Sequence, residues 1–148
     1  MTKWIFAFAV VCFASAGVRA ETISIDNAEL ARLSASGVSV IDIRTEGEWG
    51  STGIVAGSKL LTFFDEAGRS NPPQWLESVK KQVNPDQPVI LICRSGSRSA
   101  AAARFLSDQS GYKTVYNVSK GLNGWVSDGR PVVPAALPGS VCPAGSRC

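Results

Sequence analysis

The chain has 148 residues, of which 45% are hydrophobic and 18% are charged, and its formal net charge is +3 at pH 7. This length and apolar content are those of one globular domain with a buried core. The small net charge disfavours a nucleic-acid-binding protein, which would carry a pronounced excess of Lys and Arg. The chain contains no histidine, which excludes mechanisms that need a histidine base or metal ligand.

Residues 1–20 have the pattern of a secretory signal peptide. Lys3 gives a positive start, residues 4–17 are mostly apolar, and residues 18–20 place small side chains at the positions that a signal peptidase reads. The apolar run is shorter than the ~20 residues of a membrane-spanning helix, which disfavours a membrane anchor. We therefore expect cleavage before Glu21 and an exported chain, periplasmic or secreted, with no membrane span in its mature form. Export implies an oxidising compartment.

The rest of the chain alternates short strand-like segments with helical ones. The sequence predicts strands at residues 22–25, 38–44, 59–64, 89–92 and 114–118. Helices are predicted after Asp26 and Asn71, which are suited to capping a first turn, and through an alanine-rich run at residues 100–106. Such alternation is typical of an α/β fold. We expect one domain over residues 21–133, with a central parallel five-stranded sheet and helices on both faces.

The loop after the apolar strand 89–92 carries the clearest chemical signal. It begins with Cys93 and leads into the alanine-rich helix, so unpaired backbone N–H groups and the positive end of the helix dipole meet there. Such a setting stabilises a thiolate, and we predict Cys93 as a catalytic nucleophile. The alternative is an inert cysteine buried after a core strand. The predicted binding residues for an anionic substrate are the rest of the loop: Arg94, Ser95, Gly96, Ser97 and Arg98.

Two charged residues end the second predicted strand. Asp42 and Arg44 follow β-branched apolar residues, a place where an unpaired charge is costly. We expect both to support the loop: Asp42 bonds the loop backbone or Arg98, and Arg44 pairs with Glu48 to fix the neighbouring turn. The alternative is that both are solvated charges at the end of a strand.

The segment from Cys93 to Arg98 resembles the active-site loop of the rhodanese family, sulfurtransferases that carry a sulfur atom as a cysteine persulfide. Its spacing is Cys-x4-Arg. Cysteine phosphatases of the tyrosine-phosphatase type have one residue more between Cys and Arg, and the shorter loop suits a single sulfur atom better than a phosphate group. The loop length therefore favours sulfur transfer.

Two further segments are similar to rhodanese signatures. The stretch 42–49 contains Asp-x-Arg followed by an acidic-aromatic pair, and the stretch 120–125 ends in Gly-Trp, with Lys120 in place of a glycine. Residues 51–60 depart from the family, because the usual Gly-His-Ile-x-Gly-Ala is absent there. The resemblance covers about residues 22–133.

The resemblance implies a rhodanese-like sulfurtransferase that takes sulfane sulfur from a small anionic donor such as thiosulfate. The sulfur passes through a Cys93 persulfide to a small thiophile such as cyanide or to a thiol, with no cofactor and no metal. Three alternatives stay open. They are a cysteine-based phosphatase or arsenate reductase, a redox protein that uses Cys93 with C-terminal cysteines, and a non-catalytic rhodanese-like binding module.

Residues 134–148 form a tail rich in Pro and Gly that carries Cys142 and Cys148. For an exported protein, two cysteines that close a short loop predict a local disulfide, which leaves Cys93 unpaired. One alternative is that a tail cysteine attacks the Cys93 persulfide or pairs with Cys93. The other is a tail that has no task.

Overall fold

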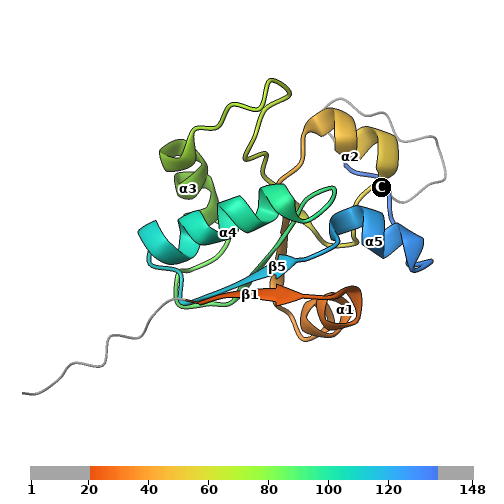
Figure 1. Cartoon of the computed structure of the whole chain (residues 1–148), viewed down its shortest axis with the longest axis horizontal. Helices are drawn as coiled ribbons and strands as arrows, with labels where there is room; N and C mark the ends of the chain where they lie inside the picture. Colours follow the sequence, from red (N-terminus) through yellow and green to blue (C-terminus); the bar gives the residue numbers. More distant parts are fainter. Residues whose placement is uncertain (1–20, 137–148) are drawn as a thin grey trace, which may run out of the picture.

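The computed structural model describes residues 21–136, which fold around a five-stranded sheet (Figure 1). The strands are β1 (Glu21–Ile25), β2 (Ser39–Asp42), β3 (Lys59–Leu60), β4 (Val89–Ile92) and β5 (Thr114–Val118). They lie in the order β1-β5-β4-β2-β3, and every neighbouring pair is parallel. The predicted α/β class with a parallel five-stranded sheet is confirmed.

The helices of the described chain are α1 (Asn27–Ala35), α2 (Glu46–Thr52), α3 (Pro72–Lys80), α4 (Ser97–Gln109) and α5 (Gly121–Ser127). Side chains cap the first three: Asp26 accepts from the backbone of Glu29, Thr45 from that of Glu48, and Asn71 from that of Gln74. Each cap satisfies an N–H group that the first helical turn leaves unpaired. Figure 1 shows α1 on one side of the sheet and α3 and α4 on the other.

Each face of the sheet is covered by its own apolar core, because side chains alternate along the central strands. Ile41 and Leu91 pack in a cluster with residues of α3 and α4, whereas Val40 and Ile90 pack with residues of α1 and α5. All four residues of β4 have an exposed fraction of 0%, as predicted for a strand buried on both faces.

The third strand is shorter than predicted. The prediction was residues 59–64, but the ladder with β2 contains only Lys59 and Leu60. After it the chain turns Phe63 into the core, where its ring packs edge-on against Trp75 at 4.7 Å between centroids. Phe64 also packs against this core, and its ring centroid lies 4.8 Å from that of Phe63. The two neighbouring rings thus share one side of the sheet, which regular strand alternation does not allow.

The carboxyl ends of β2, β4 and β5 meet at one edge of the sheet, where open α/β folds bind their ligands. From this edge the chain enters α2, α4 and α5, respectively. The three connections are short, at residues 43–45, 93–96 and 119–120, so they bring the predicted loop, the Asp-x-Arg pair and the glycine-rich segment together.

Two predictions lie outside the described residues: the signal peptide at residues 1–20, and the disulfide between Cys142 and Cys148. Within residues 21–136, no helix is long and apolar enough to span a membrane. The last described residues are tied to the domain, because Val133 and Ile54 exchange two backbone hydrogen bonds of 2.9 Å.

Candidate active site

The loop from Cys93 to Gly96 joins the central strand to α4 and takes its shape from a glycine. Gly96 has a φ of +95°, in the left-handed region that favours glycine. A Cβ atom on Gly96 would lie 2.1 Å from the carbonyl oxygen of Ser119, so no larger residue fits. The tight bend allows the backbone N–H of Gly96 to point back at the start of the loop.

The start of α5 holds the other side of the loop. The backbone N–H of Leu122 donates to the carbonyl oxygen of Cys93 at 2.8 Å, and that of Asn123 donates to the carbonyl oxygen of Arg94 at 3.0 Å. A Cβ atom on Gly121 would lie 2.5 Å from the carbonyl oxygen of Cys93. The glycine-rich segment recognised in the sequence therefore serves to bring two backbones together.

Two donors converge on the sulfur of Cys93. The backbone N–H of Gly96 donates to Sγ at 3.1 Å, and the hydroxyl of Ser99 lies 3.3 Å from Sγ. The same hydroxyl lies 3.2 Å from the carbonyl oxygen of Gly96. Since a hydroxyl carries one hydrogen, it donates to one of these acceptors at a time, and negative charge on the sulfur draws it to Sγ.

Ser99 was missed by the sequence analysis. Its signal was its place in the third position of α4, from which a side chain points back toward the loop that precedes the helix. The residue is fully buried, and a buried hydroxyl needs a hydrogen-bond partner.

The predicted nucleophile is itself enclosed. Cys93 has an exposed fraction of 0% and belongs to the core cluster on the α3 and α4 side. This burial agrees with what the alternative of an inert cysteine after a core strand predicts, and the hydrogen bonds to Sγ are what distinguish the residue from one. The enclosure also keeps bulk water away from the sulfur, which strengthens the electrostatic effect of the two donors.

Arg98 forms an ion pair with Glu48 of α2. Its two terminal nitrogens donate to the two carboxylate oxygens at 2.8 and 2.7 Å. The Arg98 guanidinium holds the pKa of Glu48 below its ordinary value, and hydrogen bonding to Glu48 raises the pKa of Arg98. The guanidinium predicted to bind substrate is thus already paired with a carboxylate, although 30% of the side chain remains exposed.

Asp42 and Arg44 form a second, buried pair, which corrects the predicted pairing. We expected Arg44 to pair with the Glu48 side chain, and Asp42 with the loop backbone or Arg98. Instead Arg44 Nε lies 2.9 and 3.0 Å from the two Asp42 oxygens, and a terminal nitrogen lies 2.7 Å from one of them. The prediction was wrong because two residues at i and i+2 share one face of an extended segment, which places the Asp42 carboxylate beside the Arg44 guanidinium.

The other N–H groups of Arg44 fix the end of α2. They donate to the Thr52 hydroxyl at 2.6 Å, to the Gly53 carbonyl at 2.8 Å and, at 3.4 Å, to the backbone carbonyl of Glu48. The Asp42–Arg44 pair therefore connects the sheet edge to the helix that carries Glu48.

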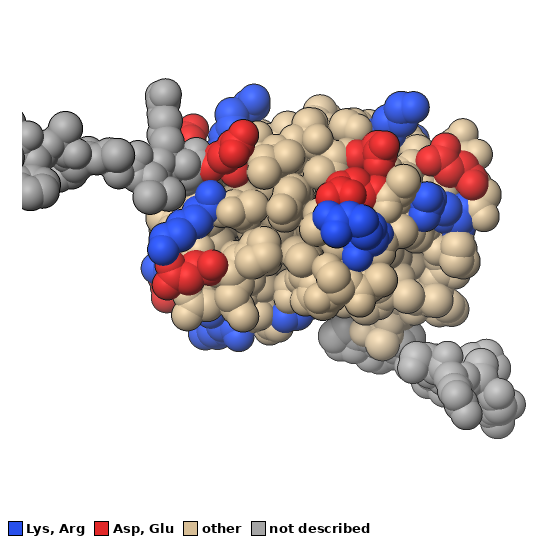
Figure 2. Space-filling model, turned by 90° about the horizontal axis from the view of Figure 1, so that it is seen from below, with Lys and Arg blue, Asp and Glu red and all other residues tan. Residues whose placement is uncertain are grey.

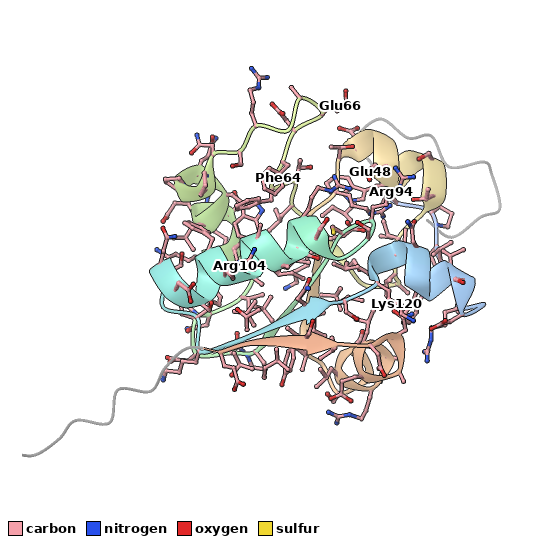
Figure 3. All side chains as sticks on the ribbon, in the orientation of Figure 1. Glu48, Phe64, Glu66, Arg94, Arg104 and Lys120 are labelled. Carbon is pink, nitrogen blue, oxygen red and sulfur yellow. The ribbon has the colours of Figure 1, made fainter. Side chains whose placement is uncertain are left out.

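Arg94 and the serines of the loop face solvent. Arg94, Ser95 and Ser97 have solvent-accessible side chains, and the hydroxyls of the two serines lie 3.4 Å apart. Figure 3 shows Arg94 and Glu48 close to each other beside α2. Arg94 lines a cleft of about 740 Å³ between α2 and α5, here called the α2–α5 cleft.

The chemistry offered by the site is that of a sulfur nucleophile with positive groups around it. Within residues 21–136, no three His, Cys, Asp or Glu side chains are grouped so that they could hold a metal ion. On the face shown in Figure 2, basic and acidic side chains lie next to each other, without a large patch of either sign.

The comparisons with known proteins agree with this architecture. The sequence model of the rhodanese-like domain matches residues 26–128. Thiosulfate sulfurtransferase 18 of Arabidopsis thaliana is 31% identical over 116 residues, which cover 76% of this chain and 84% of that protein. Rhodanese-like domain-containing protein 17 of the same plant is 33% identical over 116 residues, with 76% and 73% covered.

A solved structure of a rhodanese-related protein is also similar to this chain. The rhodanese-related protein of Thermoplasma volcanium superimposes with a TM-score of 0.59 and 30% identity, over 76% of this chain and 99% of that one. The family match spans more than half of the chain and includes the Cys93 loop, the Asp42–Arg44 pair and the glycine-rich start of α5. The chain belongs to the rhodanese-like family.

Proposed function

We propose that the protein is a sulfurtransferase that moves sulfane sulfur from a small anionic donor, such as thiosulfate, to a thiophilic acceptor through a Cys93 persulfide. The observation that carries this proposal is the pair of donors on Cys93 Sγ, from Gly96 and Ser99. Both donors point at the atom that would attack the donor, where they would stabilise the negative charge of a sulfur nucleophile. The name of the Arabidopsis relative supports the same activity.

The proposed reaction is a double displacement. The Cys93 thiolate attacks the outer sulfur of thiosulfate, the S–S bond of the donor breaks, and its electron pair leaves with sulfite. The persulfide of Cys93 then yields its outer sulfur to cyanide or a thiol, which restores the thiolate. The reaction needs no histidine, and the chain has none. Arg94 and the N–H groups of the loop would stabilise the charge of the anions.

One feature favours sulfur over phosphate as the group that is transferred. The loop has one residue fewer between Cys93 and Arg98 than that of the cysteine phosphatases, so it suits a single sulfur atom better than a phosphate group. A steady-state assay with a generic aryl phosphate would detect phosphatase activity.

The test of the proposal is a thiocyanate assay with thiosulfate and cyanide. The double displacement predicts parallel lines in double-reciprocal plots, because donor and acceptor bind in separate half-reactions. Cys93→Ser should produce no thiocyanate. Turnover by Cys93→Ser at the wild-type rate would overturn the proposal.

We further propose that the mature chain is exported after loss of residues 1–20, and that Cys142 and Cys148 form a local disulfide. Counting thiols in the exported, unfolded protein tests both points. One free thiol, on Cys93, supports the local disulfide. A disulfide that includes Cys93 would instead support the redox protein considered above.

A further inference from the structure

The α2–α5 cleft lies beside the Cys93 loop, and one of its sides is apolar. Leu122 and Val126 of α5 form this side together with Val132, which lies near the end of the described chain. Val126 has an exposed fraction of 51% and Val132 of 37%. Exposed apolar side chains gathered at a cavity are typical of a surface that another segment covers.

The apolar side of the cleft is fixed to the nucleophile. Leu122 lines the cleft, and its backbone N–H donates to the carbonyl oxygen of Cys93 at 2.8 Å. Arg94, the next residue of the loop, lines the same cleft. A segment that lies on α5 in this cleft is therefore next to the residue that would carry the persulfide.

The last described residues leave the domain beside the same cleft. Val132 lines it, and the next residue, Val133, exchanges two backbone hydrogen bonds of 2.9 Å with Ile54. Cys142 follows Val133 by nine residues in the sequence, a length that spans at most about 30 Å. Since the anchored end of the chain and the Cys93 loop border one cleft, Cys142 is within reach of the loop.

The composition of the tail suits this cleft. Residues 137–146 carry no charged side chain, and they include the apolar residues Leu137 and Val141. Two of the three charged side chains that line the cleft, Arg44 and Glu48, already take part in ion pairs. An uncharged segment therefore covers the apolar side of the cleft without burying an unpaired carboxylate, which would be costly.

We propose that residues 137–148 dock in the α2–α5 cleft and that their two cysteines accept the sulfur of the Cys93 persulfide. This proposal rests on the sulfurtransferase activity and assigns its acceptor to a dithiol of the same chain. Cys142 accepts the sulfur, because it is nearer than Cys148 to the Val133 anchor and closes the shorter loop. Cys148 then releases the sulfur, so the local disulfide between Cys142 and Cys148 is the product of the transfer.

The transfer itself balances without a further reactant. The Cys142 thiolate attacks the outer sulfur of the persulfide, the S–S bond breaks, and its electron pair leaves on Cys93 Sγ. The hydrogen bonds from Gly96 and Ser99 stabilise the charge of this leaving group. The Cys148 thiolate then attacks Sγ of Cys142, which forms the disulfide and expels hydrosulfide. The sulfane sulfur gains two electrons, and the two thiols lose these electrons and give up their protons to the sulfide.

Thiosulfate and the tail dithiol thus give sulfite, sulfide and a disulfide in one turnover. A further turnover requires an external dithiol that reduces the disulfide between Cys142 and Cys148. A single turnover of the reduced chain therefore tests the proposal without an external acceptor.

The experiment mixes the reduced, desalted exported protein with one equivalent of thiosulfate. We expect about one sulfide per chain and the loss of two thiols, at a rate independent of protein concentration because the acceptor belongs to the same chain. Cys142→Ser should keep the sulfur on Cys93, and Cys148→Ser should hold it on Cys142. Each variant should lower sulfide release at least tenfold, and alkylation followed by peptide mapping locates the sulfur. Sulfide release at the wild-type rate in either variant would overturn the proposal.

A mixture of two variants separates transfer within a chain from transfer between chains. Cys93→Ser keeps the tail cysteines but has no nucleophile, whereas the double variant Cys142→Ser/Cys148→Ser has the nucleophile but no tail acceptor. We expect the mixture to release sulfide at least tenfold more slowly than the wild type at the same total concentration. Release at the wild-type rate would mean that the tail acts on a second chain, which contradicts the proposal.

Val126→Ser tests the cleft itself. It removes apolar contact from the docked tail, so sulfide release should slow about three- to tenfold relative to thiocyanate formation with cyanide, which does not use the tail. Val133→Ser is the matched control, because Val133 has an exposed fraction of 37% but does not line the cleft. An unchanged ratio in Val126→Ser, or an equal fall in Val133→Ser, would show that the tail does not dock there.

The outcomes also distinguish this proposal from the activity on which it rests. If the wild type forms thiocyanate from thiosulfate and cyanide but releases no sulfide in the single turnover, the sulfurtransferase stands and the acceptor within the chain is wrong. If sulfide appears only after a second protein dithiol is added, the cleft takes a protein partner and our assignment fails. If the wild type forms no persulfide, the activity itself is wrong.

Discussion

The two arginine–carboxylate pairs at the carboxyl edge of the sheet differ in burial and in what they hold. Arg44 and Asp42 have side-chain exposures of 1% and 0%, whereas Arg98 and Glu48 have 30% and 26%. The buried pair uses all three guanidinium nitrogens of Arg44, toward Asp42 and toward the end of α2. The half-exposed pair joins α2 to α4 through side chains alone.

The two pairs form a chain of contacts that leads from the sheet edge to the Cys93 loop. Arg44 positions α2, α2 carries Glu48, and Glu48 positions Arg98 in the first turn of α4, next to the loop of the nucleophile. The first pair cannot lose a partner without leaving a charge in the interior, which is strongly unfavourable. The second pair is in contact with solvent, so water can hydrogen-bond to Arg98 or Glu48 if the other side chain is removed. We therefore expect the first pair to contribute more to the stability of the fold, and the second to position Arg98 beside the Cys93 loop.

The largest effect is expected from Arg44→Ala. This change leaves the Asp42 carboxylate buried and unpaired, and we expect it to lower the free energy of unfolding by about 3–5 kcal/mol. Urea denaturation followed by tryptophan fluorescence measures the loss. Arg32→Ala is the control, because the Arg32–Glu29 pair is exposed and its loss should have little effect on stability. Equal losses in the two variants would contradict the distinction.

Ser99→Ala probes the sulfur rather than the ion pairs. It removes one of the two donors on Cys93 Sγ, and hydrogen bonds to a charged group contribute about 1.5–3 kcal/mol. The rate of persulfide formation with thiosulfate should fall roughly ten- to hundredfold, since 1.4 kcal/mol is about a factor of ten. Ser107→Ala, at a buried serine further along α4, should keep the wild-type rate. A wild-type rate in Ser99→Ala would show that this donor is irrelevant to the thiolate.

Glu48→Gln tests the half-exposed pair. We expect a loss of about 1 kcal/mol or less in the free energy of unfolding at neutral pH, because water and the amide oxygen of the new side chain can still accept hydrogen bonds from Arg98. Thermal unfolding and urea denaturation both measure this. A loss as large as that of Arg44→Ala would mean that the two pairs have the same role.

The smallest effect concerns the pH dependence of this pair. Hydrogen bonding to Arg98 lowers the pKa of Glu48 in the folded chain, so the unfolded chain binds the proton first as the pH falls. The stability that the pair contributes is present above about pH 5 and is lost as the pH falls through the lowered pKa. The difference in unfolding free energy between wild type and Glu48→Gln should thus be constant near neutrality and shrink in acid. A difference that grows as the pH falls would contradict the ion pair.

Much of the fold was predictable because its signals are local. The strand Val89–Ile92 and the caps at Asp26 and Asn71 each depend on a few neighbouring residues. Cys93 could be chosen as the candidate nucleophile because the strand, the loop and the helix start that surround it are contiguous in the sequence.

Several of the features that were missed depend on contacts between distant segments. The partner of Glu48 is Arg98, fifty positions away, and nothing near Glu48 indicates that Arg98 is preferred over Arg44. The residues after β3 were predicted as strand because they are mostly apolar and aromatic, but the packing of Phe63 against Trp75 in the core decides their path. The α2–α5 cleft arises from two helices and a segment near the C-terminus, so no single stretch of sequence encodes it.

The central claim is that Cys93 carries a sulfur atom. The most direct test is the intact mass of the reduced, desalted protein after brief treatment with thiosulfate. The account predicts a gain of one sulfur atom on the wild type, located on Cys93 and removed by cyanide, and no gain on Cys93→Ser. An unmodified wild-type mass, or the same gain on Cys93→Ser, would contradict it.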